Sequence, residues 1–231
     1  MKIKMNHRKN LEWFYSLTSN LLNMIIRPYI HKIDGMHNIP KDKPFIVAAN
    51  HASYIDDFII TTFIIKYTKK KTNIFVNSRY FINDTFGKIL NNLGGIAVDV
   101  YISISSDKKR KQTNERAFKK AVDGLKKGEL FAIFPEGGRS EEGIIKKAKT
   151  GVARVALVSK VPVIPVGIKG SYQVMPKGAI FPRFKRLDVV FGKPMLFDKY
   201  YGKEKDYKTL RKVTTLIMKN IAKLTGQKYN Y

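Results

Sequence analysis

Six short apolar runs restrict the fold of this chain more than any other feature. They lie at residues 44–49, 73–77, 95–100, 130–134, 161–167 and 187–191. Runs of this length, bounded by turn residues, are typical of buried strands. Helical spacing of apolar residues recurs between or after them, at 57–67, 85–93, 114–127, 151–159 and 207–224. This alternation predicts an α/β domain with a largely parallel central sheet flanked by helices.

The N-terminal segment differs from the rest of the chain. Large apolar side chains recur at roughly helical spacing between Leu11 and Ile30, mixed with Ser, Thr and Asn and flanked by basic residues. The segment is too polar to cross a bilayer, and it suits either an amphipathic helix at the membrane interface or a helix packed on the core. We therefore expect an interfacial helical segment, 1–32, and an α/β domain, 33–231. No spanning helix or cleavable signal peptide is expected.

The charge of the chain is strongly positive. Lys and Arg number 44 against 18 Asp and Glu, which gives a formal net charge of +26. Nucleic acid, an anionic membrane and a phosphate-bearing substrate are all suitable partners, and compositional drift toward lysine is the alternative without function. No nucleic-acid-binding motif is visible, so we expect no nucleic-acid partner. The absence of Cys excludes disulfides, thiolate nucleophiles and zinc–thiolate sites.

Basic clusters occur in separate predicted loops, at 69–71, 108–111, 146–147 and 183–186. Each Lys or Arg close to an anionic bilayer contributes about 1 kcal/mol of attraction. Several such clusters, together with the N-terminal segment, predict a peripheral membrane protein on the cytoplasmic face that binds an anionic membrane surface.

The loop after the first apolar run contains a His and two carboxylates, in the order NHASYIDD from Asn50 to Asp57. Positions five apart on one helix are rotated by about 140°, so His51 and Asp56 can meet only if a turn separates them. A strand end followed by a helix start supplies that turn. A His with a carboxylate partner is the usual general base with its orienting group. A purely structural pair and metal ligation that includes Asp57 are the alternatives.

The loop after the fourth run reads FPEGGRS from Phe134 to Ser140. Its two glycines allow backbone amides to approach a ligand, and Arg139 offers a planar fork suited to phosphate. A tight turn with an exposed Arg would have the same sequence. In α/β sheets, functional groups collect just past the carboxyl ends of strands, where both loops are expected.

Taken together, the two loops resemble the lysophospholipid acyltransferase family, whose members include 1-acylglycerol-3-phosphate acyltransferases. The match is Asn-His-x-Ser-x-x-Asp followed about 80 residues later by Phe-Pro-Glu-Gly-x-Arg-Ser. Weaker similarities to other blocks of the family lie at 95–100, 149–154 and 161–166. The resemblance covers roughly residues 33–195.

The resemblance implies a mechanism in which His51 deprotonates an acceptor hydroxyl that attacks an acyl thioester, while Asp56 holds the imidazole. It implies that the residues that bind substrate include Asn50, Ser53, Arg79, Glu136, Gly137, Gly138, Arg139 and Ser140. The expected acyl cleft is lined by Pro162, Val163, Ile164 and Pro165. The donor would be acyl-CoA or acyl carrier protein, the acceptor a lysolipid, and neither a metal nor another cofactor is expected.

Two departures from the family pattern bear on the acceptor. Val100 stands where phosphatidate-forming members usually have Arg, and Gly138 stands where Thr is common. Arg79, Lys108, Lys109 or Arg110 could substitute for the missing Arg, or the acceptor could be another lysolipid. We expect 1-acylglycerol-3-phosphate as acceptor, with another lysolipid, thioester hydrolysis and a basic nucleic-acid-binding module as the alternatives in that order.

Overall fold

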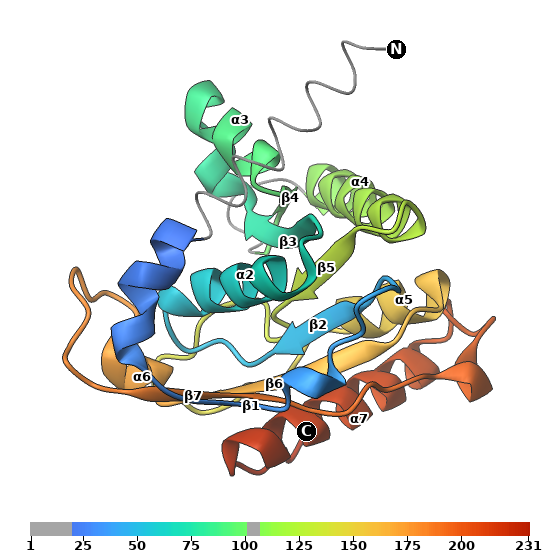
Figure 1. The fold of residues 1–231 in the computed structure, drawn as a ribbon. Helices are drawn as coiled ribbons and strands as arrows, with labels where there is room; N and C mark the ends of the chain where they lie inside the picture. The colour runs from blue at the N-terminus through green and yellow to red at the C-terminus, as the bar shows by residue number, and fades with distance from the viewer. Residues whose placement is uncertain (1–19, 101–106) are drawn as a thin grey trace.

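A computed structural model of the chain describes residues 20–100 and 107–231. Within these residues a seven-stranded sheet has the order β1-β7-β6-β2-β5-β3-β4 (Figure 1). All neighbouring strands are parallel except β6 and β7. The strands are β1 (Ile30–Asp34), β2 (Ile46–Ala49), β3 (Thr72–Asn77), β4 (Gly95–Val98), β5 (Leu130–Ile133), β6 (Val163–Lys169) and β7 (Leu187–Phe191). The predicted α/β class with a largely parallel sheet is confirmed.

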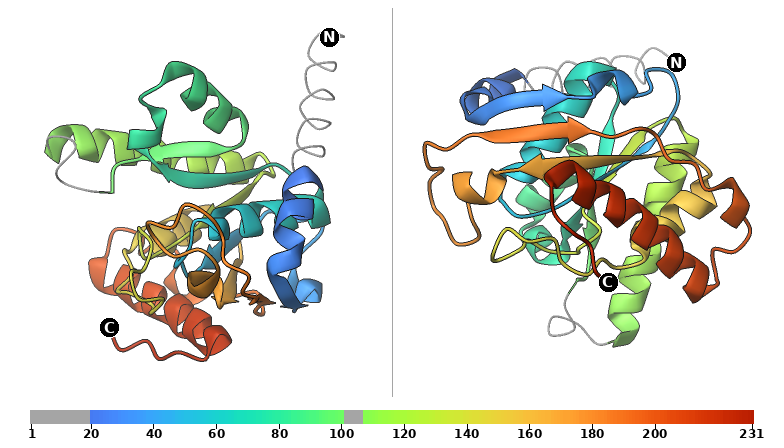
Figure 2. Two further views of the ribbon diagram at one scale, coloured as in Figure 1. Left: turned by 90° about the vertical axis from the view of Figure 1, so that its left-hand side faces the viewer. Right: turned by 90° about the horizontal axis from the view of Figure 1, so that it is seen from below.

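Helices cover both faces of the sheet (Figures 1 and 2). One face packs against α4 (Asp107–Lys126), α5 (Gly151–Ser159) and α7 (Tyr207–Thr225). The other packs against α2 (Ile55–Thr68), the short α6 (Ser171–Val174) and a helical stretch at 20–26. The remaining helix, α3 (Asp84–Asn92), contacts β4 at the edge of the sheet.

The central strands are continuous apolar runs because both faces of each strand are covered. All four residues of β2 are buried; Ile46 and Ala48 face the α4–α5–α7 layer, whereas Val47 and Ala49 face α2. A strand that alternates between two helical layers needs apolar residues at every position. This double burial fixes the position of β2, whose carboxyl end leads into the candidate site.

The sheet begins earlier than the sequence predicts. β1 pairs in parallel with β7, so the expected division at residue 32 falls inside a strand. As an edge strand, β1 buries mainly Ile30 and leaves His31 and Lys32 exposed, and it therefore has no apolar run. α4 also begins earlier than predicted, because its first two turns are almost wholly polar.

The described part of the N-terminal segment packs with one side and exposes the other. In the helical stretch 20–26, Ile26 is buried in the core and Leu22 packs on it, whereas Leu21, Met24 and Ile25 are more than half exposed. Residues 1–19, on which most of the predicted interfacial helix falls, lie outside the described residues. Among the helices at 20–100 and 107–231, none combines the length and apolarity needed to cross a membrane.

Candidate active site

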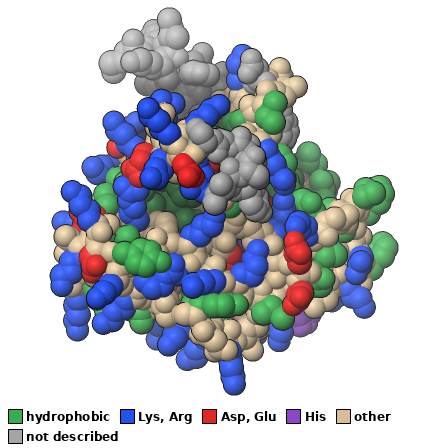
Figure 3. All heavy atoms as spheres, turned by 180° about the vertical axis from the view of Figure 1, so that it is seen from behind, with side chains coloured by type: hydrophobic (Ala, Val, Ile, Leu, Met, Phe, Trp, Pro, Cys, Tyr) green, Lys and Arg blue, Asp and Glu red, His purple; other side chains and the backbone are tan. Residues whose placement is uncertain are grey.

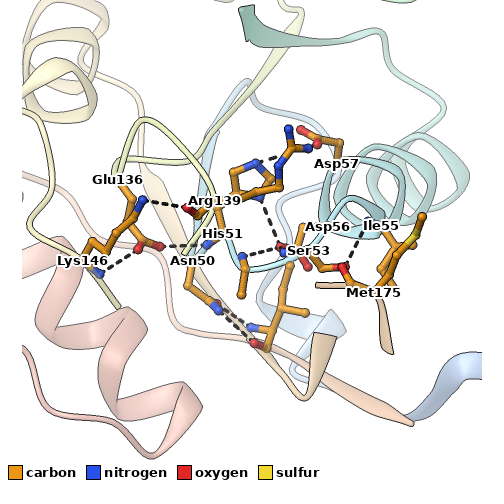
Figure 4. A network of polar contacts seen from close by, with 12 residues as sticks. Asn50, His51, Ser53, Ile55, Asp56, Asp57, Glu136, Arg139, Lys146 and Met175 are labelled. Atoms are coloured by element: carbon orange, nitrogen blue, oxygen red, sulfur yellow. Dashed lines mark hydrogen bonds and ion pairs between the residues drawn. The ribbon is translucent and has the colours of Figure 1, made fainter. Parts of the chain in front are cut away.

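The turn between β2 and α2 brings His51 and Asp56 together. Asp56 Oδ2 lies 3.2 Å from His51 Nδ1 and accepts hydrogen bonds of 2.7 Å from the backbone N–H groups of Ala52 and Ser53 (Figure 4). Asp56 is fully buried in the first turn of α2. A carboxylate held by two amides keeps the proton of the imidazole on Nδ1, which leaves Nε2 as the proton acceptor.

The imidazole of His51 is also held on one face. It stacks on the ring of Phe134, with 4.1 Å between ring centroids and 18° between the planes. Its Nε2 lies 3.9 Å from Oδ2 of Asp57, and both side chains line a cavity. Burial raises the pKa of the Asp57 carboxyl, partly offset by the nearby His51. The basic edge of the imidazole therefore borders the cavity next to a second carboxyl group.

Glu136, in the second loop, is hydrogen-bonded to the first. Its carboxylate accepts hydrogen bonds from the backbone N–H of His51 at 2.8 Å and of Lys146 at 2.7 Å (Figure 4). The Ser140 N–H also donates to the His51 carbonyl at 2.8 Å. Burial raises the pKa of Glu136 to about 7, although both backbone hydrogen bonds act in the opposite direction. Glu136 thus fixes the backbone of His51 and does not itself line the cavity.

A cavity of about 990 Å³ opens beside His51, at the carboxyl ends of the parallel strands. One part of its wall is polar and the other apolar. The polar part includes His51, Asp57, Arg79, Tyr80, Arg139 and Lys149. The apolar part includes Phe58, Ile65, Phe75, Val76, Leu90, Leu93, Val98 and Phe118.

Two arginines converge on one tyrosine in the polar wall. Arg79 Nη2 donates to Tyr80 Oη at 2.9 Å, and Arg139 Nη2 approaches the same oxygen at 3.4 Å. The Arg139 guanidinium also stacks 3.8 Å above the ring of Tyr54. Burial alone would raise the pKa of Tyr80, but the hydrogen bonds and charges of the two arginines outweigh it and lower that pKa. This wall presents two cations to a cavity that His51 also lines.

Comparison with known protein families identifies the family of this chain. The family model described as Acyltransferase matches residues 31–169.

This chain belongs to the acyltransferase family.

Relatives and a solved structure are consistent with that membership. The chain is 24% identical over 183 residues to the 1-acyl-sn-glycerol-3-phosphate acyltransferase of Bacillus subtilis, covering 78% of this chain and 82% of the relative. It is 28% identical to a chloroplastic enzyme of that name from Brassica napus, covering 65% of this chain but only 40% of the relative. The crystal structure of the 1-acyl-sn-glycerophosphate acyltransferase from Thermotoga maritima has the same fold, with a TM-score of 0.62 at 24% identity over 96% of this chain and 81% of that one.

A lysine of this acyltransferase approaches the position where the family pattern has Arg. Val100 lines the cavity, and Lys149 Nζ donates to its carbonyl oxygen at 3.0 Å. Burial and the charges of Arg110 and Lys146 lower the pKa of Lys149. Of the four substitutes predicted from the sequence, Arg79 lines the cavity, whereas Lys108, Lys109 and Arg110 do not border it in the described part of the chain.

Three polar side chains predicted to bind substrate instead hold the backbone. The Asn50 side chain donates to the Ile168 carbonyl at 2.9 Å and accepts from the Ile168 N–H at 2.7 Å. Ser53 Oγ donates to the Met175 carbonyl at 2.6 Å, and the buried Ser140 accepts from the Glu142 N–H at 3.4 Å. The described cavity wall includes Gly137, Gly138 and Arg139 from the second loop, but none of these three.

The four residues predicted to line an acyl cleft do not border the described cavity. Val163, Ile164 and Pro165 belong to β6, in the middle of the sheet between β2 and β7, and Pro162 directly precedes it. Val163 packs into the α7 side of the core and Ile164 into the α2 side, so neither borders the described cavity. The correction has a simple reason: a strand covered on both faces by helices has no side of its own left for a ligand.

Among the residues of the cavity wall that sequence reasoning missed are Tyr54, Tyr80 and Lys149. Tyr54 lies inside the first motif, and its contact with Arg139 depends on how the two loops meet. Lys149 lies two residues before α5, at the start of the segment 149–154 that resembles the family, and that resemblance was the available signal. Within residues 20–100 and 107–231, no group of three or more His, Asp or Glu side chains is arranged to hold a metal ion.

Proposed function

We propose that this acyltransferase transfers a fatty acyl group from an acyl thioester to the hydroxyl of 1-acylglycerol-3-phosphate, forming phosphatidate. The observation that carries the proposal is the position of the Nε2 edge of His51 in one cavity with Arg79 and Arg139 on one wall and an apolar surface on another. An acceptor with a hydroxyl, a phosphate and an acyl chain matches these three surfaces. The names of the relatives point to the same acceptor.

The reaction follows from the hydrogen-bonding state of the imidazole. The acceptor hydroxyl donates its proton to His51 Nε2 as its oxygen attacks the thioester carbonyl carbon. Asp56 stabilises the imidazolium that forms, because its carboxylate lies 3.2 Å from Nδ1. The tetrahedral intermediate then expels the thiolate as the carbon–sulfur bond breaks, and the proton on Nε2 passes to the leaving sulfur. The imidazole returns to its starting state.

The part of the cavity wall formed by Arg79, Tyr80 and Arg139, which we call the cationic wall, suits an acceptor that carries a phosphate. Arg79 and Arg139 lie close enough to share one tyrosine oxygen, and Lys149 has further cations nearby. Like charges at such distances repel one another, and an anion between them relieves the repulsion. Arg79 and Lys149 would then perform the role of the Arg that Val100 replaces.

The apolar wall supports a lipid chain. A volume of about 990 Å³ is at the upper end of the range for ligand pockets. Apolar side chains from α2, β3, α3, β4 and α4 line this part. One acyl chain would leave water on entering it, which stabilises the complex in proportion to the apolar area buried.

The enzyme would act as a peripheral protein on an anionic membrane at the cytoplasmic face, with acyl-CoA or acyl carrier protein as donor. The net charge of +26 favours binding to an anionic membrane surface. Lys and Arg side chains are spread widely over the face seen in Figure 3, with few Asp or Glu among them.

A panel of acceptors tests the proposal. The protein is incubated with one acyl-CoA, or with acyl carrier protein carrying the same chain, and with lysophospholipids that differ only in headgroup. We expect phosphatidate from 1-acylglycerol-3-phosphate at a rate at least about tenfold above the other acceptors, on the scale of one lost charge-assisted contact. Preference for another headgroup would refute the acceptor, and equal release of free acid with and without acceptor would indicate a thioesterase.

A further inference from the structure

The loop between α6 and β7 exposes large apolar side chains to water. Ile180 is 81% exposed, Phe181 78% and Phe184 fully exposed. A folded protein rarely leaves several large apolar side chains of one short segment uncovered unless they contact a partner or a membrane. The loop therefore needs a covering partner.

Cations alternate with these apolar side chains. Arg183, Lys185 and Arg186 are exposed in the same loop, and Lys177 lies near its start. Apolar groups that reach the acyl boundary, with cations at the depth of anionic headgroups, are the combination that binds a bilayer surface. A protein partner would have to supply both an apolar pocket and a ring of acidic groups.

The base of the loop is fixed to the active site. Ser53, in the turn between β2 and α2, donates to the Met175 carbonyl, and the Arg183 N–H donates to the Val174 carbonyl at 2.7 Å. Lys177 forms an ion pair with Glu141 and lines the cavity. The exposed tip is thus held at a set position relative to the cavity.

A second apolar surface lies at the same end of the molecule. The helical stretch 20–26 exposes Leu21, Met24 and Ile25, and its Leu22 lines the cavity. Figures 1 and 2 show this stretch and the loop between α6 and β7 on the same side. Both elements that expose apolar side chains there also contribute to the cavity wall.

We propose that Ile180, Phe181 and Phe184 insert into an anionic bilayer beside the helical stretch 20–26, so that a lipid acceptor enters the cavity directly from the membrane. The proposal rests on the proposed function in one respect, namely that the acceptor is a lysolipid. Direct entry would spare the acyl chain of the acceptor from crossing water.

Vesicle partitioning of a triple variant tests the insertion. Ile180→Ser, Phe181→Ser and Phe184→Ser are combined, and binding to phosphatidylglycerol vesicles is compared with that of the parent protein. We expect partitioning to fall by at least about tenfold, on the scale of one large side chain leaving the bilayer. Leu196→Ser is the matched control, because Leu196 is 58% exposed beyond the opposite end of β7. Equal partitioning of the triple variant and the parent protein would overturn the proposal.

A fluorescent probe measures insertion even if other segments contribute to binding. Trp13 is the single tryptophan of the chain, so Phe184→Trp in a Trp13→Phe background reports on the loop alone. We expect a blue-shifted emission on binding to vesicles and quenching by lipids brominated on their acyl chains. Leu196→Trp in the same background should show neither. Emission from position 184 that stays water-like on sedimented vesicles would exclude insertion.

Activity toward a short-chain, water-soluble acceptor separates this inference from the proposed function. The triple variant should keep the parent rate with that acceptor while losing rate with vesicle-borne acceptor. A parent protein that acylates neither acceptor would refute the proposed function, whereas the partitioning and fluorescence results would still decide the insertion.

Discussion

The catalytic turn, residues 50–57, and the cationic wall formed by Arg79, Tyr80 and Arg139 differ in how they are held. In the catalytic turn, a fully buried carboxylate accepts three hydrogen bonds, and the His51 backbone is bonded on both sides. In the cationic wall, the two guanidinium groups meet at the hydroxyl of Tyr80, a residue that is 37% exposed.

The difference indicates that the two parts of the cavity have separate roles. Proton transfer requires the imidazole in a single position and protonation state, and buried hydrogen bonds supply this. Holding a charged headgroup requires cations that can adjust to it, which partly hydrated Arg side chains can do. Changes in the turn should therefore affect kcat, and changes in the wall should affect KM.

The largest effect should follow removal of the general base. His51→Ala should lower kcat by about 10²–10⁴-fold, because Nε2 of this imidazole borders the cavity and is the proposed acceptor of the hydroxyl proton. Steady-state rates with saturating acceptor measure this, with circular dichroism as the check on folding. A variant that kept more than a tenth of the parent rate would contradict the role of His51 as general base, and with it the difference between turn and wall.

Asp56→Asn should come next. Oδ2 alone accepts from Nδ1 and from both backbone amides, so an Asn oxygen at that position keeps these hydrogen bonds but loses the negative charge that stabilises the imidazolium. We expect kcat to fall by about 10²-fold or more with little change in KM. Asp57→Asn is the matched comparison and should cost less than about tenfold, because Asp57 Oδ2 lies 3.9 Å from the ring nitrogen, beyond hydrogen-bonding distance. Equal losses in the two variants would contradict the distinct role of Asp56.

Glu136 should make stability depend on pH. Its pKa is raised from an ordinary value of 4.5 to about 7 by burial. A raised carboxyl pKa favours the folded state below pH 4.5, and this contribution is lost as the pH rises through 7, by up to about 3 kcal/mol. In Glu136→Gln this part of the pH dependence should vanish. Denaturant unfolding of both proteins from pH 4 to 8 measures the difference, and parallel curves would show that Glu136 titrates normally.

The smallest effect should come from the cationic wall. Arg139→Ala should raise KM for a phosphate-bearing acceptor by about tenfold and change kcat less, since one charge-assisted hydrogen bond is lost. Added salt should weaken acceptor binding in the parent more than in the variant. Arg116→Ala, on the exposed side of α4, is the control for a change in net charge. A fall in kcat with KM unchanged would indicate that Arg139 acts in the proton-transfer step, not in binding the headgroup.

The fold class could be predicted because burial on both faces leaves a direct mark on sequence. Runs such as 130–134 are apolar at every position only if two helical layers cover them. β1 and the start of α4 left no such mark, since an edge strand and an exposed helix need few apolar residues. Residues 162–165 do not reach the described cavity for the same reason that made β6 easy to find, namely that its side chains pack into the core.

By itself the sequence predicted that His51 and Asp56 meet, because a His and an Asp five residues apart after a buried strand can face each other only across a turn. It also determined the family, through the two loops read together. Only the tertiary structure decided which polar side chains of those loops reach the cavity. Asn50 and Ser53 turn to the backbone of β6 and of the residue after α6, whereas Tyr80 and Lys149 turn inward, because those directions depend on segments that are far away in the chain.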